Sequence, residues 1–174
     1  MTETKAYENF PVWIPVFSTI LTLLIYAIGV YVFARFGIVP VIIYVAYCIW
    51  VEMRVLRKSC VNCYYYGNLC GLGRGVLCSL LFKKGDPQKF IEKDISWKQI
   101  VPDFLVFIFP LTGGIILLIK DFSLFLLFLL IVLFIISFLG SAVVRGSFAC
   151  KYCKQREIGC PAEKLFGKQK PQTT

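Results

Sequence analysis

Residues 60–70 read CVNCYYYGNLC, and ninety positions later residues 150–160 read CKYCKQREIGC. Both stretches have the cysteine spacing C-x2-C-x6-C, and each follows a pair of long apolar runs. Together they hold six of the eight cysteines in the chain. A seventh, Cys78, follows the first triplet, and the eighth, Cys48, lies inside an apolar run. The predictions of fold and function both start from this pairing of apolar runs with cysteines.

The apolar runs predict an all-α integral membrane protein. Of the 174 residues, 58% are hydrophobic and 16% aromatic, which is more than an ordinary soluble domain contains. Four stretches have no charged residue: residues 9–34, 36–51, 104–119 and 122–144. A helix needs about 20 residues to cross a bilayer. Because the second stretch is shorter than this, we expect Glu52 and Arg54 to lie on the last turns of its helix.

The runs divide the chain into two membrane hairpins and two polar segments. The predicted order is a first transmembrane hairpin (residues 1–53), a Cys-rich loop (54–102), a second transmembrane hairpin (103–145) and a basic Cys-containing tail (146–174). Within the loop, residues 88–100 set apolar side chains against lysines. This pattern is typical of short amphipathic helices on a membrane surface, and equally of a plain soluble helix.

Proline and glycine interrupt the third apolar run at Pro110 and at Gly113-Gly114. Such a break can free backbone groups to bind a substrate or an ion. It can also serve a kink or a close approach between helices. We expect the packing role here.

Shifting the sequence by ninety residues superposes the two hairpins as well as the cysteines. Both hairpins enter and leave on the same side, which predicts two parallel repeats related by a pseudo-twofold axis along the membrane normal. Such an axis would bring the two triplets together beneath a four-helix bundle. Cys78 has no counterpart in the second copy, so the two halves are not equivalent.

Basic residues predict which side the cysteines face. Lys and Arg number 17 in the termini and the central loop but only 2 in the opposite turns, Arg35 and Lys120. Cytoplasmic segments carry such an excess, so we expect both termini and both triplets in the cytoplasm. The formal net charge of +9 accordingly indicates a lipid surface rather than nucleic acid. The expected partners are the bilayer and other subunits of a membrane complex.

Metal binding is the function that best explains the loop cysteines. The cytosol keeps thiols reduced, which argues against disulfides. Lipidation needs no triplet spacing, and inert burial suits only Cys48. Two thiolates separated by two residues can reach one ion, and we expect nearby Lys and Arg to favour the thiolate form. The candidate metal ligands are Cys60, Cys63, Cys70, Cys78, Cys150, Cys153 and Cys160.

Two kinds of metal centre fit this set. Zinc could take the two C-x2-C pairs, Cys60/Cys63 and Cys150/Cys153, as one tetrahedral site. Iron–sulfur clusters could use all seven sulfurs, with one complete cluster in the first copy and one with a non-cysteine or open position in the second. This favours them slightly, although neither triplet has the bacterial ferredoxin spacing. The chain contains no histidine, so it lacks the commonest neutral-pH base and any imidazole ligand.

The resulting hypothesis is a multi-pass membrane protein with a cytoplasmic cysteine-ligated metal site, serving electron transfer as a redox subunit. One alternative is a zinc-stapled structural or assembly protein. The other is a transporter or sensor for a soft metal ion. Enzymatic activity stays open, and no catalytic residue stands out, because no nucleophile is paired with a base.

Overall fold

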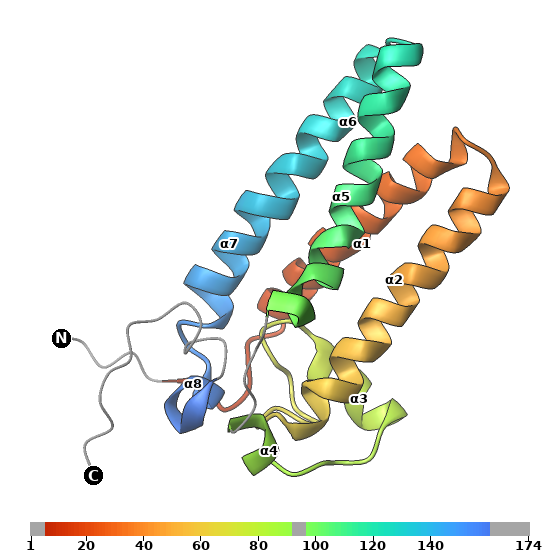
Figure 1. Cartoon of the computed structure of the whole chain (residues 1–174). Coiled ribbons are helices and arrows are strands. Elements are labelled where there is room, and N and C mark those ends of the chain that lie inside the picture. The colour runs from red at the N-terminus through yellow and green to blue at the C-terminus, as the bar shows by residue number, and fades with distance from the viewer. Residues whose placement is uncertain (1–5, 92–96, 161–174) are drawn as a thin grey trace.

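The structure is a computed structural model that describes residues 6–91 and 97–160. Within these ranges, four helices are long and apolar enough to cross a membrane (Figure 1). They are α1 (Trp13–Ala34), α2 (Ile38–Lys58), α5 (Trp97–Lys120) and a fourth that runs from α6 (Leu124–Ile135) through η2 (Ile136–Gly140) and α7 (Ser141–Val143) to η3 (Val144–Ala149). The predicted all-helical membrane architecture is therefore confirmed for the described residues.

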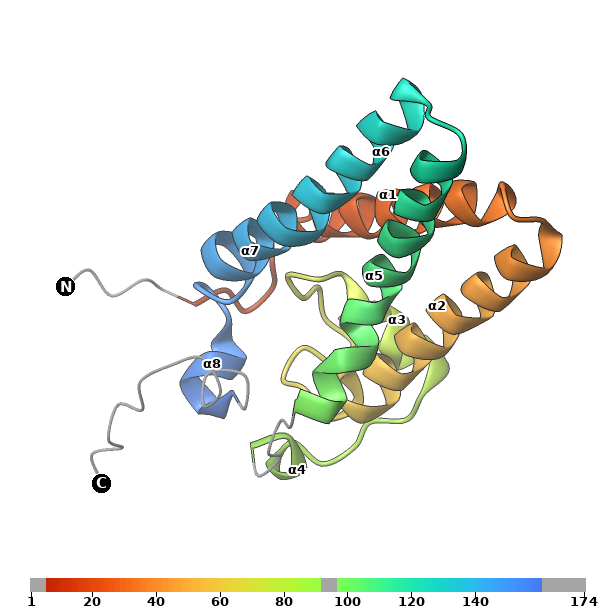
Figure 2. The ribbon, with the colours of Figure 1, turned by 45° about the horizontal axis from the view of Figure 1, so that its top comes forward.

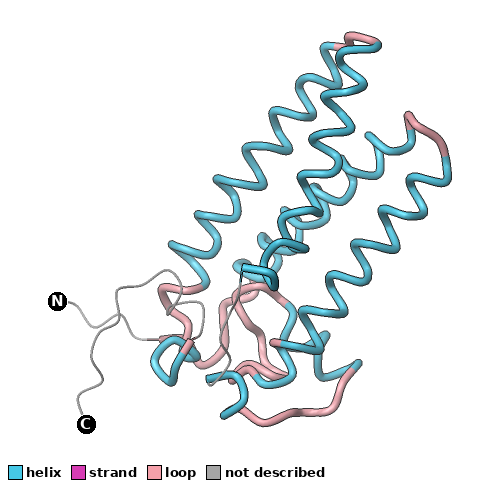
Figure 3. Tube along the Cα trace, viewed as in Figure 1, coloured by secondary structure: helices cyan, strands magenta, loops and turns pink. Residues whose placement is uncertain are grey.

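Shorter elements gather at one end of the long helices, opposite the turns that join α1 to α2 and α5 to α6 (Figures 1 and 2). These elements are η1 (Cys60–Asn62), α3 (Arg74–Leu81), α4 (Gln88–Ile91) and α8 (Lys154–Gly159). Most of the described non-helical chain lies at this same end (Figure 3). The two cysteine triplets therefore share one face of the molecule.

The long helices extend beyond the charge-free runs. As expected, α2 continues through Glu52 and Arg54. The third membrane helix begins earlier than its apolar run, at Trp97, so residues 97–100 belong to it and not to a surface helix. The fourth ends at Ala149, and Arg145 therefore lies inside it instead of ending it. Part of the predicted amphipathic segment, including Ser96, lies outside the described residues.

Pro110 does not break α5, and Tyr44 provides the physical reason. A proline has no N–H, so the carbonyl four residues earlier, that of Val106, loses its helical hydrogen bond. The Tyr44 hydroxyl on α2 donates to this carbonyl at 3.0 Å. Membrane helices tolerate proline where a neighbour replaces the missing donor in this way.

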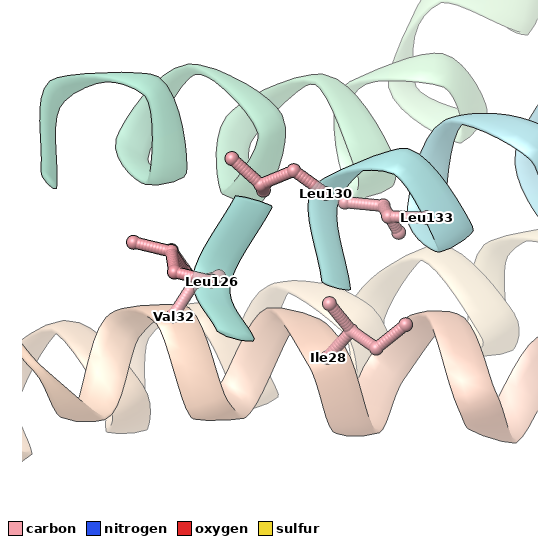
Figure 4. Packing of buried hydrophobic residues seen from close by; sticks show 5 residues of the cluster. All are labelled: Ile28, Val32, Leu126, Leu130 and Leu133. Carbon is pink, nitrogen blue, oxygen red and sulfur yellow. The ribbon is translucent and has the colours of Figure 1, made fainter. Parts of the chain in front are cut away.

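Small residues bring the helices close together. The position that a Cβ would take on Gly29 of α1 is already filled by the ring of Tyr44, and on Gly114 of α5 by the side chain of Leu130. The predicted packing role of the Gly113-Gly114 pair is thus confirmed at Gly114. A core of buried side chains joins α1 to α6 beside these contacts (Figure 4), namely Ile28, Val32, Leu126, Leu130 and Leu133. The pseudo-twofold relation between the hairpins stays a prediction.

Replacing Gly29 by Ala should destabilise the bundle by about 1–3 kcal/mol, because the added methyl group collides with Tyr44. Tyr44 is only 3% exposed and is held by its hydrogen bond to Val106, so it has nowhere to move. Unfolding of the purified protein in micelles, followed by circular dichroism, measures the effect. Gly113→Ala is the matched control, since its nearest new neighbours would lie at 3.6 Å. Equal stability of the two variants would contradict the proposed contact.

Candidate metal centre

Three segments that are distant in sequence meet at the loop end of the bundle. The N-terminal segment lies between the two cysteine segments, because the Tyr7 N–H donates to the Tyr152 carbonyl at 2.9 Å and the Phe10 N–H to the Leu69 carbonyl at 3.1 Å. Directly between the triplets, the Tyr64 N–H donates to Oε1 of Gln155 at 2.7 Å. The two triplets are therefore parts of one packed unit.

Tyr65 lies at the centre of this unit and is 1% exposed. Its hydroxyl donates to the Tyr7 carbonyl at 2.5 Å and accepts from the Lys154 N–H at 2.9 Å. Burial raises the pKa of Tyr65 to about 12, so the hydroxyl stays protonated at neutral pH. Phe10 and Ile14 are buried with it, and around these three pack Cys63, Tyr64, Cys70, Phe148, Tyr152 and Cys153.

The two C-x2-C stretches follow the same backbone course. In each, the second cysteine N–H donates to the carbonyl of the first, at 3.3 Å for Cys63 and 3.4 Å for Cys153. The second cysteines are both extended, with φ near −82° and −83°. In each copy the carbonyl of that cysteine then accepts an N–H from three residues further along. The sequence similarity of the pairs is thus matched by their local structure.

Backbone N–H groups also point at the second sulfur of each pair. The N–H of Tyr65 hydrogen-bonds to the Cys63 sulfur, and those of Gln155 and Arg156 to the Cys153 sulfur. These bonds favour the thiolate, but burial outweighs them and raises the pKa of Cys63 to about 11 and that of Cys153 to about 12. The expectation that Lys and Arg leave these thiols ionised is therefore wrong: burial, which disfavours the charged form, is the larger effect.

The Cys63 thiol has sulfur neighbours from both segments. It interacts electrostatically with the thiols of Cys70, Cys153 and Cys160. Within the first segment, Cys60 interacts in the same way with Cys63, Cys70 and Cys78. No disulfide joins any of the eight cysteines, all of which lie in the described part of the chain. Among residues 6–91 and 97–160, no three Cys, Asp or Glu side chains are placed to hold one metal ion.

The remaining predicted ligands lie at the margins of this group. Cys78 is fully buried, and its thiol donates to the Leu56 carbonyl at 3.7 Å, near the end of α2. Cys150 is exposed. Cys48 is buried among Tyr44, Val51 and Val106, as expected of an inert cysteine. The thiols that interact between the two segments are therefore those of Cys63, Cys153 and Cys160.

Sequence reasoning missed an ion pair beside this site. A guanidinium nitrogen of Arg74 lies 2.6 Å from the Glu52 carboxylate, which also accepts the Tyr26 hydroxyl at 2.6 Å. Burial acts to lower the pKa of Arg74, but the charge and hydrogen bond of Glu52 outweigh it and raise that pKa, so Arg74 stays charged. A lone carboxylate on the last turns of a membrane helix needs a partner. Glu52 is such a carboxylate, so the sequence already indicated that it would have a partner.

Removing the Tyr65 hydroxyl should loosen the contact between the triplets. Tyr65→Phe leaves the Tyr7 carbonyl and the Lys154 N–H without their partner, which costs about 1–3 kcal/mol. We expect faster labelling of Cys153 by maleimide, measured by mass spectrometry of the digested protein. Tyr66→Phe is the control, because the Tyr66 hydroxyl bonds only within the first segment, to the Phe82 carbonyl at 2.7 Å. Unchanged labelling in Tyr65→Phe would refute the bridging role.

Comparison with known proteins gives no relative from which a function could be transferred. No family model matches the sequence, and neither does any curated protein or solved structure. The function is therefore argued from the arrangement of the residues themselves.

Proposed function

We propose that the chain is a multi-pass membrane protein whose two cysteine segments share one four-thiolate metal site. The ligands are Cys63, Cys70, Cys153 and Cys160. The observation that carries this proposal is that Cys63, Cys70 and Cys153 pack around one buried cluster, and that the Cys63 thiol interacts electrostatically with the thiols of Cys70, Cys153 and Cys160. Bound metal would join the start of the central loop to the C-terminal segment.

The chemistry of the site suits a metal ion. Buried thiols hold their protons at neutral pH, whereas a bound cation replaces those protons and stabilises the thiolates. The N–H groups aimed at Cys63 and Cys153 supply the outer hydrogen bonds that sulfur ligands receive in metal sites. Four thiolates around one ion are the tetrahedral arrangement that structural zinc adopts. Since no three sulfurs converge in the described chain, metal binding would draw them inward by side-chain rotation.

An iron–sulfur cluster for electron transfer is the second candidate. It is favoured by the electrostatic contacts of Cys60 with Cys63, Cys70 and Cys78, which make the first segment a possible four-cysteine site of its own. A cluster arrangement that uses all seven loop sulfurs is less well supported by the structure, because of the position of Cys78. Cys78 already has a hydrogen-bond acceptor at Leu56 and lies apart from the second segment.

Two serine variants separate these candidates. For the shared site, Cys160→Ser should lower metal affinity at least about tenfold, because even outer-shell changes at metal sites cost that much. Cys78→Ser should keep its metal, since a serine hydroxyl can still donate to Leu56. Anaerobic purification with metal analysis and visible absorption measures both. A brown protein with iron and sulfide, lost in Cys78→Ser and kept in Cys160→Ser, would overturn the shared site.

The proposed orientation places the metal site in the cytoplasm. The excess of basic residues in the termini and central loop supports it. The hydrogen bonds from the N-terminal segment to both cysteine segments require that all three lie on the same side of the membrane, whichever side that is.

Cys150 is the natural probe of this orientation because it is exposed. A membrane-impermeant maleimide should fail to label it in intact cells and should label it after permeabilisation. A variant with a new cysteine at the outer turn, Ser123→Cys, serves as the positive control for labelling from outside. Labelling of Cys150 in intact cells would reverse the proposed orientation.

A further inference from the structure

A second polar feature lies inside the bundle, away from the cysteines. A cavity of about 60 Å³ separates α1, the glycine-rich loop before α3 and the fourth membrane helix. Two arginines line it, Arg74 from the first turn of α3 and Arg145 from η3, and so do the hydroxyl-bearing residues Ser18, Thr22 and Ser141. Such a cluster of cations and hydroxyls is unusual between apolar helices, where charged side chains are costly.

The helix that forms one wall is not a regular α-helix. Both η2 and η3 are π-helical, and they contribute Ile136, Gly140, Val144 and Arg145 to the cavity. Short π-helical stretches occur frequently at functional sites. In η2, Ser137 is 6% exposed, and its hydroxyl has no hydrogen-bond partner within the described residues. The fourth membrane helix therefore departs from α-helical geometry at Arg145, where it lines the cavity.

The local charges leave room for an anion. Arg74 is paired with Glu52. Asp103 is the other nearby carboxylate, and Arg54, Arg74 and Arg145 all interact with it electrostatically. One oxygen of Asp103 is buried without a hydrogen-bond partner in the described chain, so these arginines only partly compensate it. In this region Arg54, Arg74 and Arg145 thus exceed the two carboxylates by one positive charge, although Arg54 does not itself line the cavity.

The depth of the cavity matches the lipid headgroup boundary. Arg145 precedes the helix end at Ala149 by four residues, which is about 6 Å at 1.5 Å per residue. An arginine at this depth can reach phosphate oxygens at the bilayer surface. Basic pockets between membrane helices bind anionic headgroups in this way.

We infer that this cavity binds a phosphate-class oxyanion, held by Arg145 and Arg74 with hydroxyl donors from Ser18 and Ser141; the Thr22 hydroxyl already donates to the Ser18 carbonyl at 3.0 Å. The planar guanidinium presents paired N–H donors that match two oxygens of a phosphate. The phosphate can belong to the headgroup of an anionic phospholipid or be free in solution. The site is independent of the metal centre, because it uses no cysteine.

Two binding measurements on the purified full-length protein test the inference and distinguish the sources. In the first, delipidated protein in micelles is heated with inorganic phosphate or with chloride at equal ionic strength. In the second, native mass spectrometry compares retention of phosphatidylglycerol and phosphatidylcholine offered in equal amounts. Stabilisation by phosphate assigns a free oxyanion, and preferential retention of phosphatidylglycerol alone assigns a lipid headgroup. If neither phosphate nor phosphatidylglycerol has an effect, the proposed site is wrong.

Arg145→Gln should weaken the observed binding about tenfold, since it removes a charge-assisted hydrogen bond. Arg57→Gln is the matched control. Arg57 is an exposed arginine in the last turn of α2, at the loop end of the bundle, and it does not line the cavity. Arg145→Lys keeps the charge but loses the paired donors, and it should weaken binding less than Arg145→Gln. This variant also tests the site if Arg145→Gln does not fold. Binding that Arg145→Lys and Arg57→Gln reduce equally would refute a specific cavity.

Discussion

The hydroxyl of Tyr65 is the interaction on which the loop end of the molecule depends. It bonds at once to the Tyr7 carbonyl and to the Lys154 N–H, and so joins the beginning, middle and end of the chain. Both hydrogen bonds are partly buried, and they reinforce the parallel bridge that pairs Tyr7 with Cys153. Phe10, Ile14 and Tyr65 together form the buried cluster against which Cys63 and Cys153 pack, and burial raises the pKa of both thiols.

The membrane part and the loop end are held together by different forces. Between membrane helices, lipid is as apolar as the side chains, so association relies on close packing and hydrogen bonds. Tyr44 makes contacts of both kinds: its ring packs closely against Gly29, and its hydroxyl donates a hydrogen bond to the Val106 carbonyl. At the loop end, burial of Phe10, Ile14 and Tyr65 from water provides the driving force instead.

Much of the helical architecture could be predicted, because charge-free length alone indicates membrane helices. The ends were less predictable, since α5 and the fourth helix continue past the charge-free runs into charged residues such as Asp103 and Arg145. The meeting of the triplets was inferred from the repeat, and their contact is present in the structure. The pair of Glu52 and Arg74 was not foreseen, because the two residues are 22 positions apart and the chain between them includes a loop whose path no local pattern determines.

That loop, residues 71–75, connects the cysteines to the bundle, and its glycines are needed for steric reasons. Gly71 packs against Ala149, where a Cβ would lie 2.7 Å from the alanine methyl group. Gly73 adopts a φ of +72°, which few other residues tolerate, and so directs Arg74 towards Glu52. At Gly75 a Cβ would collide with the Tyr65 and Asn68 carbonyls. One short segment therefore touches the fourth helix, the buried ion pair and the tyrosine beside the sulfurs. A side chain added at Gly71 or Gly75 would disturb the candidate metal centre without removing any of its sulfurs.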